Sequence, residues 1–124
     1  MHGKSLVATD SLTSGSQLGQ EIIVPVPVDP NIPRCWEVVV NWSTAAVTGT
    51  VLLTLDIRGK TGFWQDSGWP SITLPGTGSG QYTAGAVCTD TALSVRARSS
   101  GITGGTVTTN TSLVELGPLP AVSR

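Results

Sequence analysis

The sequence predicts an all-β protein, an antiparallel β-sandwich that is jelly-roll-like and built from about eight or nine short strands. Three observations lead to this fold class. Apolar and polar residues alternate with a period of two in several segments, which places one set of side chains on one face of a strand. Turns rich in Gly and Pro separate these segments at intervals of about a dozen residues. No stretch combines helical periodicity with capping residues.

The segment from residue 35 to residue 58 is predicted to be the centre of the core. Its two halves both alternate and are rich in β-branched and aromatic residues, which favour strands. Val47-Thr48-Gly49 supplies a turn between them, so we expect a hairpin. The residues expected to be buried, here and in a later strand, are Trp36, Val38, Val40, Val51, Leu53, Leu55, Leu93 and Val95.

The other elements divide the chain into three parts. Residues 1–20 are predicted as an N-terminal arm with a short strand over 5–9, residues 21–116 as the sandwich, and residues 117–124 as an extended tail. Residues 21–28 are expected to form an edge strand, because Pro25 and Pro27 remove two donors from one side of it. The glycines at 76, 78 and 80 predict a flexible loop. The remaining predicted strands are 63–65, 71–74, 81–83, 86–88, 92–98 and 106–116.

Composition limits the classes of partner. Charged residues make up 12% of the chain, about half the usual share, and the formal net charge is −1. No general electrostatic field therefore favours nucleic acid or an anionic membrane. The low charge predicts that a protein partner covers part of the surface. The N-terminal residues lack the apolar segment of a signal peptide, so we expect synthesis and folding in a cytoplasm.

The two cysteines, Cys35 and Cys88, are too few and too far apart in sequence for a disulfide scaffold or a zinc site. Because folding is expected in a reducing compartment, we predict that both are reduced in freshly made protein. A bridge formed later, outside the cell, is the alternative.

The sequence offers no familiar catalytic set. His2 is the single histidine, so a nucleophile activated by histidine is not available in the usual form. The acidic residues are spread singly; Glu37 and Asp56 are expected to face each other on the outer side of the central hairpin, as polar surface residues. We expect no enzymatic activity, no cofactor and no metal.

Two groups of residues are candidate binding sites. The first is an aromatic cluster, Phe63, Trp64, Trp69 and Tyr82, which predicts either a stacking platform for a sugar ring or rings that close one end of the sandwich or fill a subunit contact. The second is Arg96 and Arg98 on the outward face of one strand, which can grip a partner carboxylate or form a solvated face.

The C-terminal tail is a third candidate. Pro118 and Pro120 restrict its unfolded conformations, so ordering it on a partner costs less entropy. Leu119 and Val122 supply apolar contacts in this segment. The tail is therefore predicted to lie across a neighbouring chain.

Residues 92–108, ALSVRARSSGITGGTVT, resemble the closing strands of small β-sandwich structural proteins of tailed bacteriophages. The upstream segments CWEVVVNWS, TVLLTLDIRGKTGFWQD and GQYTAG follow a similar order, so the resemblance covers about residues 35–114. It is most like the capsid decoration, or cement, proteins. It implies a virion protein on the capsid exterior, made in the host cytoplasm, that binds the major capsid protein and itself as a homotrimer, without nucleic acid or membrane. A carbohydrate-binding or receptor-binding module of a fibre, with a glycan as ligand, and a neck or tail connector are the alternatives.

Overall fold

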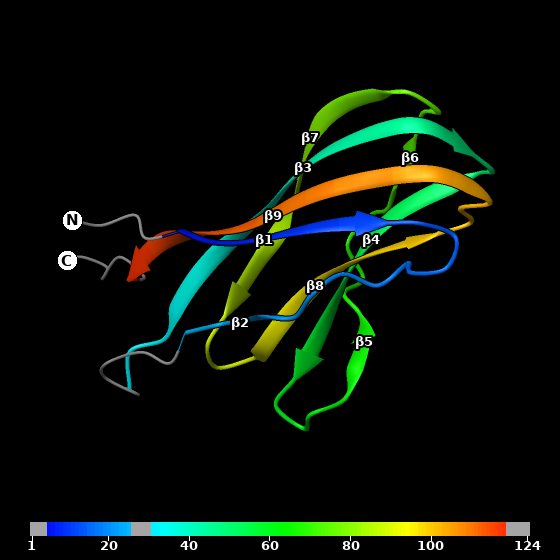
Figure 1. Cartoon of the computed structure of the whole chain (residues 1–124). Helices are drawn as coiled ribbons and strands as arrows, with labels where there is room; N and C mark the ends of the chain where they lie inside the picture. Colours follow the sequence, from blue (N-terminus) through cyan, green and yellow to red (C-terminus); the bar gives the residue numbers. More distant parts are fainter. Residues whose placement is uncertain (1–4, 26–30, 119–124) are drawn as a thin grey trace.

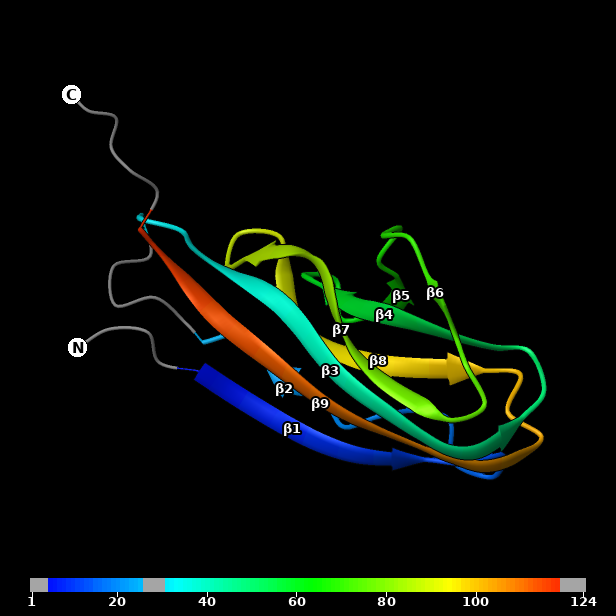
Figure 2. The same cartoon turned by 90° about the horizontal axis from the view of Figure 1, so that it is seen from above.

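The computed structural model describes residues 5–25 and 31–118, and these form an all-β protein of two antiparallel sheets packed face to face (Figure 1). Both sheets appear as separate layers when the molecule is seen from above (Figure 2). The strands are β1 Ser5–Leu12, β2 Ile22–Ile23, β3 Arg34–Thr48, β4 Val51–Gly59, β5 Trp64–Asp66, β6 Ile72–Leu74, β7 Gly78–Cys88, β8 Ala92–Ser100 and β9 Gly104–Pro118.

The strand order is that of a jelly roll. One sheet, called sheet A here, has the order β1-β9-β3-β7, and the other, sheet C, has the order β2-β8-β4-β5 with β6 also paired to β4. Since β5 and β6 pair with different parts of β4, they act as one interrupted strand. The pairs are then β1 with β9, β2 with β8, β3 with β7, and β4 with β5 and β6, so strands pair from the two ends of the chain inward. The predicted fold class is confirmed, although β3 and β9 are 15 residues long rather than short.

The predicted hairpin between residues 35 and 58 is wrong. The two strands exist, as β3 and β4, but β3 belongs to sheet A and β4 to sheet C, so they face each other across the core. The turn at Val47-Thr48-Gly49 is a corner between the sheets. Gly49 has a φ of 97° there, and a Cβ on it would lie 2.1 Å from the carbonyl oxygen of Gly101 in the β8–β9 connection. Glycine is required at this position because the two connections pack so closely.

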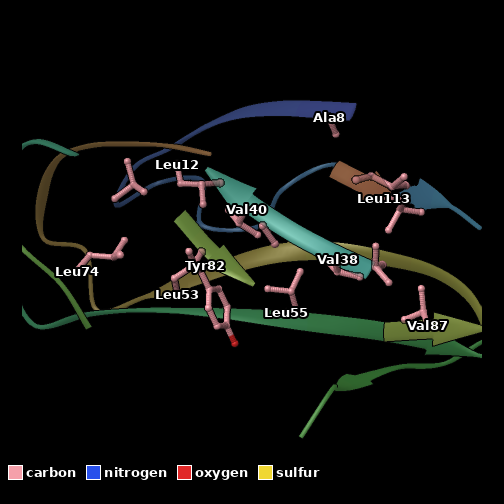
Figure 3. Close-up of a cluster of buried hydrophobic side chains, with 14 of the residues drawn as sticks. Ala8, Leu12, Val38, Val40, Leu53, Leu55, Leu74, Tyr82, Val87 and Leu113 are labelled. Atoms are coloured by element: carbon pink, nitrogen blue, oxygen red, sulfur yellow. The ribbon is translucent and has the colours of Figure 1, made fainter. Parts of the chain in front are cut away.

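The core lies between the sheets, where side chains from both layers point toward one another (Figure 3). Seven of the eight residues predicted to be buried are buried. Leu93 is only half-buried, while its neighbours Ala92 and Ser94 are buried. Ser94 is buried on the outer side of sheet C because its hydroxyl donates to Glu21 Oε2 at 2.5 Å, which covers that part of β8.

Two other predicted boundaries differ in the structure. Residues 5–20, predicted as an arm with a short strand, supply the edge strand β1 and the core side chains Ala8 and Leu12. The glycines predicted to form a loop are partly inside β7, a continuous strand over residues 78–88. Gly80 leaves room for the ring of Trp42, since a Cβ there would approach that ring to 2.7 Å. Gly80 therefore serves close packing of the Trp42 ring rather than loop flexibility.

The N-terminal part of sheet C agrees with the edge prediction. β2 is at the edge of this sheet and pairs only with β8. Val24 N still donates to the carbonyl of Leu93 at 2.9 Å. This is expected, because the amide of Val24 points to the side of the strand opposite the proline nitrogens, where donors remain. Of the predicted strand over residues 21–28, positions 26–28 lie outside the described residues.

The cysteines are also different from the prediction. Cys35 and Cys88 form a disulfide bond in the structure, so the expectation of two reduced thiols is wrong for this state. The reason is the register of β3 and β7, which places the two cysteines directly opposite each other with their Cα atoms 4.0 Å apart. The distance along the sequence, 53 residues, gave no indication of this proximity.

Candidate partner-binding surface

The outer face of sheet C carries a compact charged cluster. Arg96 and Arg98 alternate with buried residues on β8, so both side chains leave the core side of the sheet. Asp56 on β4 lies directly opposite Arg96 in the register, and Asp66 on β5 lies opposite Asp56. We call these four residues with Trp64 the arginine face.

Asp56 is the centre of the arginine face. It is 4% exposed although it points away from the core, because both arginines cover it. Arg96 Nε donates to Asp56 Oδ2 at 3.2 Å, and Arg98 Nε donates to Asp56 Oδ1 at 3.0 Å. A buried carboxylate needs such charge-assisted hydrogen bonds to offset the loss of water. The two guanidinium groups therefore hold a carboxylate of their own chain.

Both arginines reach across β4 to strand β5. Arg98 NH2 lies 3.2 Å from Asp66 Oδ2, and the guanidinium carbon of Arg96 lies 4.1 Å from the centroid of the Trp64 ring. Stacking of a guanidinium on an indole face combines cation–π attraction with apolar contact. Arg96 is thereby fixed from two sides, by Asp56 and by Trp64.

The exposed aromatic residue nearest in sequence to this arrangement is Phe63. It precedes Trp64 in the connection between β4 and β5, and it is 76% exposed. Aromatic residues and arginine are the types most enriched at energetically important contacts between proteins. A fixed Arg–Trp pair, with an exposed Phe one residue away in the sequence, is therefore a set of residue types suited to a protein partner.

A second ion-pair cluster continues this face toward β2. Glu21 Oε2 lies 3.1 Å from Arg58 NH2 on β4 and accepts the hydroxyl hydrogen of Ser94 on β8. Arg58 and Ser94 are opposite each other in the register. This cluster ties the residue before β2 to the sheet and leaves Glu21 and Arg58 partly exposed.

The four aromatic residues predicted as one cluster are divided between two places. Tyr82 is buried on β7 and donates its hydroxyl hydrogen to the carbonyl of Pro70. Trp69 packs against the core and over Gly85, where a Cβ would approach the ring to 2.5 Å. These two rings close the side of the sandwich between β7 and the β5–β6 connection. The four rings do not assemble into one platform for a sugar.

Burial has an electrostatic effect at Tyr82. The pKa of its phenol is raised above the usual value of 10.0, first because burial disfavours the phenolate and second because of the negative charge of Asp66. The neutral phenol is the form that donates to Pro70. Tyr82 therefore has a structural role at this side of the sandwich.

Sequence reasoning did not find the partners of the two arginines. It placed Asp56 opposite Glu37 across a hairpin, which is wrong because β3 and β4 lie in different sheets. The parity of Asp56 was the available signal: it alternates with Leu53 and Leu55, so it had to lie on the outer face. Only the pairing of β4 with β8 shows that this face also carries Arg96 and Arg98.

Two predicted partner-binding residues, Leu119 and Val122, lie outside the described residues. Within residues 5–25 and 31–118, no group of three or more His, Cys, Asp or Glu side chains is placed to hold a metal ion. That part of the chain also contains no helix long and apolar enough to cross a membrane.

Comparison with known proteins gives little beyond this geometry. No protein-family model and no curated protein matches the chain. Among solved structures, the chain is similar to the Drosophila NLP core, for which pentamer formation and histone binding are described. The identity is 9% and the TM-score 0.46, over 90% of this chain and 97% of that one. A likeness this distant carries no argument about the function of this protein.

Proposed function

We propose that this protein is a non-enzymatic structural protein of a tailed-phage particle: a capsid decoration protein, acting as a homotrimer, that binds across major capsid subunits and stabilises the head. The proposal starts from the resemblance of residues 35–114 to small phage structural proteins. On this view the sandwich is a rigid body that bridges neighbouring subunits, and several weak contacts per particle add through avidity.

The observations that support a protein-binding role most directly are the fixed Arg96–Trp64 pair and the exposed ring of Phe63, the residue before Trp64. Asp56 and Trp64 hold Arg96 in place before any partner arrives, so binding costs less side-chain entropy than for a free arginine. Phe63 supplies apolar area that is 76% exposed in the free protein and that a pocket on a capsid subunit would cover.

Co-sedimentation with purified expanded capsids of the phage tests this function. The wild-type chain is expected to sediment with the capsids, and Phe63→Ala is expected to weaken binding by about tenfold or more, as loss of an aromatic anchor does. Ile32→Ala is the matched control, because Ile32 is also an exposed apolar residue, 47% exposed, but lies in the segment before β3. Its binding should equal that of the wild type.

The same proteins distinguish the alternatives. Failure of the wild-type chain to bind capsids would overturn the decoration role. Equal binding by Phe63→Ala and wild type would remove Phe63 from the contact. Saturable binding of a glycan, lost in Phe63→Ala and accompanied by no capsid binding, would instead support the carbohydrate-binding fibre module.

A further inference from the structure

The outer face of sheet A differs from the arginine face in carrying almost no charge. Thr9, Asn110, Asn41 and Gln81 form one row across all four strands, each opposite the next, and all four are exposed. Gln81 Nε2 donates to Asn41 Oδ1 at 3.1 Å within this row. Where the four strands pair, Glu37 is the single charged side chain that points outward among the described residues. We call this surface the uncharged face.

An apolar cluster occupies one end of the uncharged face. Ser112 on β9 lies between Val7 on β1 and Val39 on β3 in the register, and Val114 is the next outward residue on β9. Val7 is 56% exposed and Val114 is 36% exposed. Side chains at such diagonal positions are near neighbours on a sheet. Covering this cluster is favourable, because apolar surface leaves water.

We infer that copies of this chain pack against one another through the uncharged face. In a closed symmetric assembly, a surface near the symmetry axis meets copies of itself. Charges spread over such a surface would oppose like charges, which disfavours association. A face of uncharged side chains with one apolar cluster avoids this repulsion.

The β1 edge of sheet A is covered at Thr9, which opposes association by strand addition at that point. The carbonyl oxygen of Thr9 on the edge strand β1 accepts a hydrogen bond from Gln20 Nε2 at 2.9 Å. Gln20 N is in turn held by the carboxylate of Asp10, at 3.1 Å from each oxygen. A strand from a second copy cannot pair with β1 at Thr9 while Gln20 occupies it. Strand addition at this point of the β1 edge therefore does not compete with packing of faces.

The size of the uncharged face suits a contact between subunits. Four strands about 4.8 Å apart, paired over the eight residues 37–44 of β3 at about 3.4 Å each, cover roughly 520 Å² in projection. A standard interface buries about 800 Å² per partner. β3 and β9 extend beyond the four-stranded region, since both are 15 residues long, and they provide further area.

Sedimentation of the full chain without capsids tests the inference. The wild-type protein is expected to associate between about 1 and about 100 μM. Asn110→Lys, which places a charge at the centre of the uncharged face, is expected to weaken association by about tenfold or more. Gln65→Lys adds the same charge at an exposed position on β5 of sheet C and should associate like the wild type. Circular dichroism checks that both variants keep the sheet spectrum.

This inference rests on the homotrimer of the proposed function and assigns its interface to the uncharged face. Its outcomes are nevertheless separate from those of the capsid-binding test. A wild-type chain that is monomeric at about 100 μM would overturn it, as would Asn110→Lys that associates like the wild type. Dissociation by Gln65→Lys would place the contact on the other sheet and also overturn it. Asn110→Gln keeps the position uncharged and should still associate, so a folding defect at residue 110 is distinguished from repulsion. Capsids are absent throughout, so failure of capsid binding leaves this test unaffected.

Discussion

Cys35 at the start of β3 and Cys88 at the end of β7 lie opposite each other and are joined by a disulfide bond. The bond connects an internal strand of sheet A to its edge strand β7. Two hydrogen bonds between Arg34 and Thr89 continue the connection beyond it: Arg34 N donates to Thr89 Oγ1, and Thr89 N donates to the carbonyl of Arg34. The end of β7 is therefore held at two successive residue pairs, Cys35–Cys88 and Arg34–Thr89.

The disulfide gives the first prediction. Without reductant, the denatured protein should contain no free thiol. After reduction it should contain two. The double variant Cys35→Ser/Cys88→Ser should lose about 2–4 kcal/mol of unfolding free energy, because the bond closes a long loop in the unfolded chain. Urea unfolding with and without reductant measures this loss. Two free thiols in the unreduced protein would show that the bond does not form under those conditions.

The buried carboxylate of Asp56 gives the second prediction. Asp56→Asn keeps the shape but removes the charge that both Arg96 and Arg98 contact, so the variant should lose about 2–4 kcal/mol of unfolding free energy. Asp66→Asn is the matched control. The side chain of Asp66 is 59% exposed, and its loss should cost less than about 1 kcal/mol. Equal costs in urea unfolding would contradict the central role of Asp56.

The hydroxyl of Thr111 gives the third prediction. Its Oγ1 is buried in the core and has no hydrogen-bond partner among the residues that the structure describes. Thr111→Val replaces this hydroxyl with a methyl group and should raise the unfolding free energy by about 1 kcal/mol, since an unpaired buried hydroxyl is costly. Thr73→Val, at an exposed position on β6, should change it little. A clear loss of stability in Thr111→Val would mean that the hydroxyl is hydrogen-bonded.

The phenol of Tyr82 gives the fourth prediction. Its pKa is raised in the folded protein, so the folded state keeps the proton more tightly than the unfolded state. The stabilisation is complete below the unfolded pKa of about 10 and is lost as the pH rises through the higher folded value. Tyr82→Phe removes the hydrogen bond to Pro70, so its unfolding free energy at neutral pH should be about 1 kcal/mol lower than that of the wild type. The variant should also lack the loss of stability that the phenol causes at alkaline pH.

Tyr82 is the single tyrosine of the chain, so the ultraviolet absorbance of phenolate follows its titration directly. Urea unfolding of both proteins at several alkaline pH values provides the stability comparison. Titration of the folded protein at or below the ordinary tyrosine value would contradict the burial of this phenol.

The core of β4 gives the fifth prediction. Leu53 is fully buried between the sheets and Leu52, the next residue, is 37% exposed on the opposite side. Leu53→Ala should cost about 2–5 kcal/mol through lost burial and the cavity left behind. Leu52→Ala should cost less than about 1 kcal/mol, as surface changes usually do. Similar losses in thermal or urea unfolding would mean that the face assigned to β4 is wrong.

The candidate surface was only partly predictable. Arg96 and Arg98 were correctly placed on an outward face, because alternation on one strand is enough to assign a face. Their contact with Asp56 and the stacking on Trp64 depend on which strands are neighbours, and alternation contains no information about neighbours. The aromatic residues were divided between two places for the same reason, since Trp64 follows β4 while Tyr82 lies on β7, beside β3.

By itself, the sequence determined the all-β class, the turns and the inward faces, because a period of two is a local property that burial selects along each strand. The same alternation was enough to assign Val38, Val40, Leu53 and Leu55 to the core. Only the tertiary structure decided that β3 and β4 lie in opposite sheets, that Cys35 meets Cys88, and that Asp56 lies between two arginines. The last two of these relationships join residues about 40 or more positions apart, and all three exist only when the whole chain has closed into two layers.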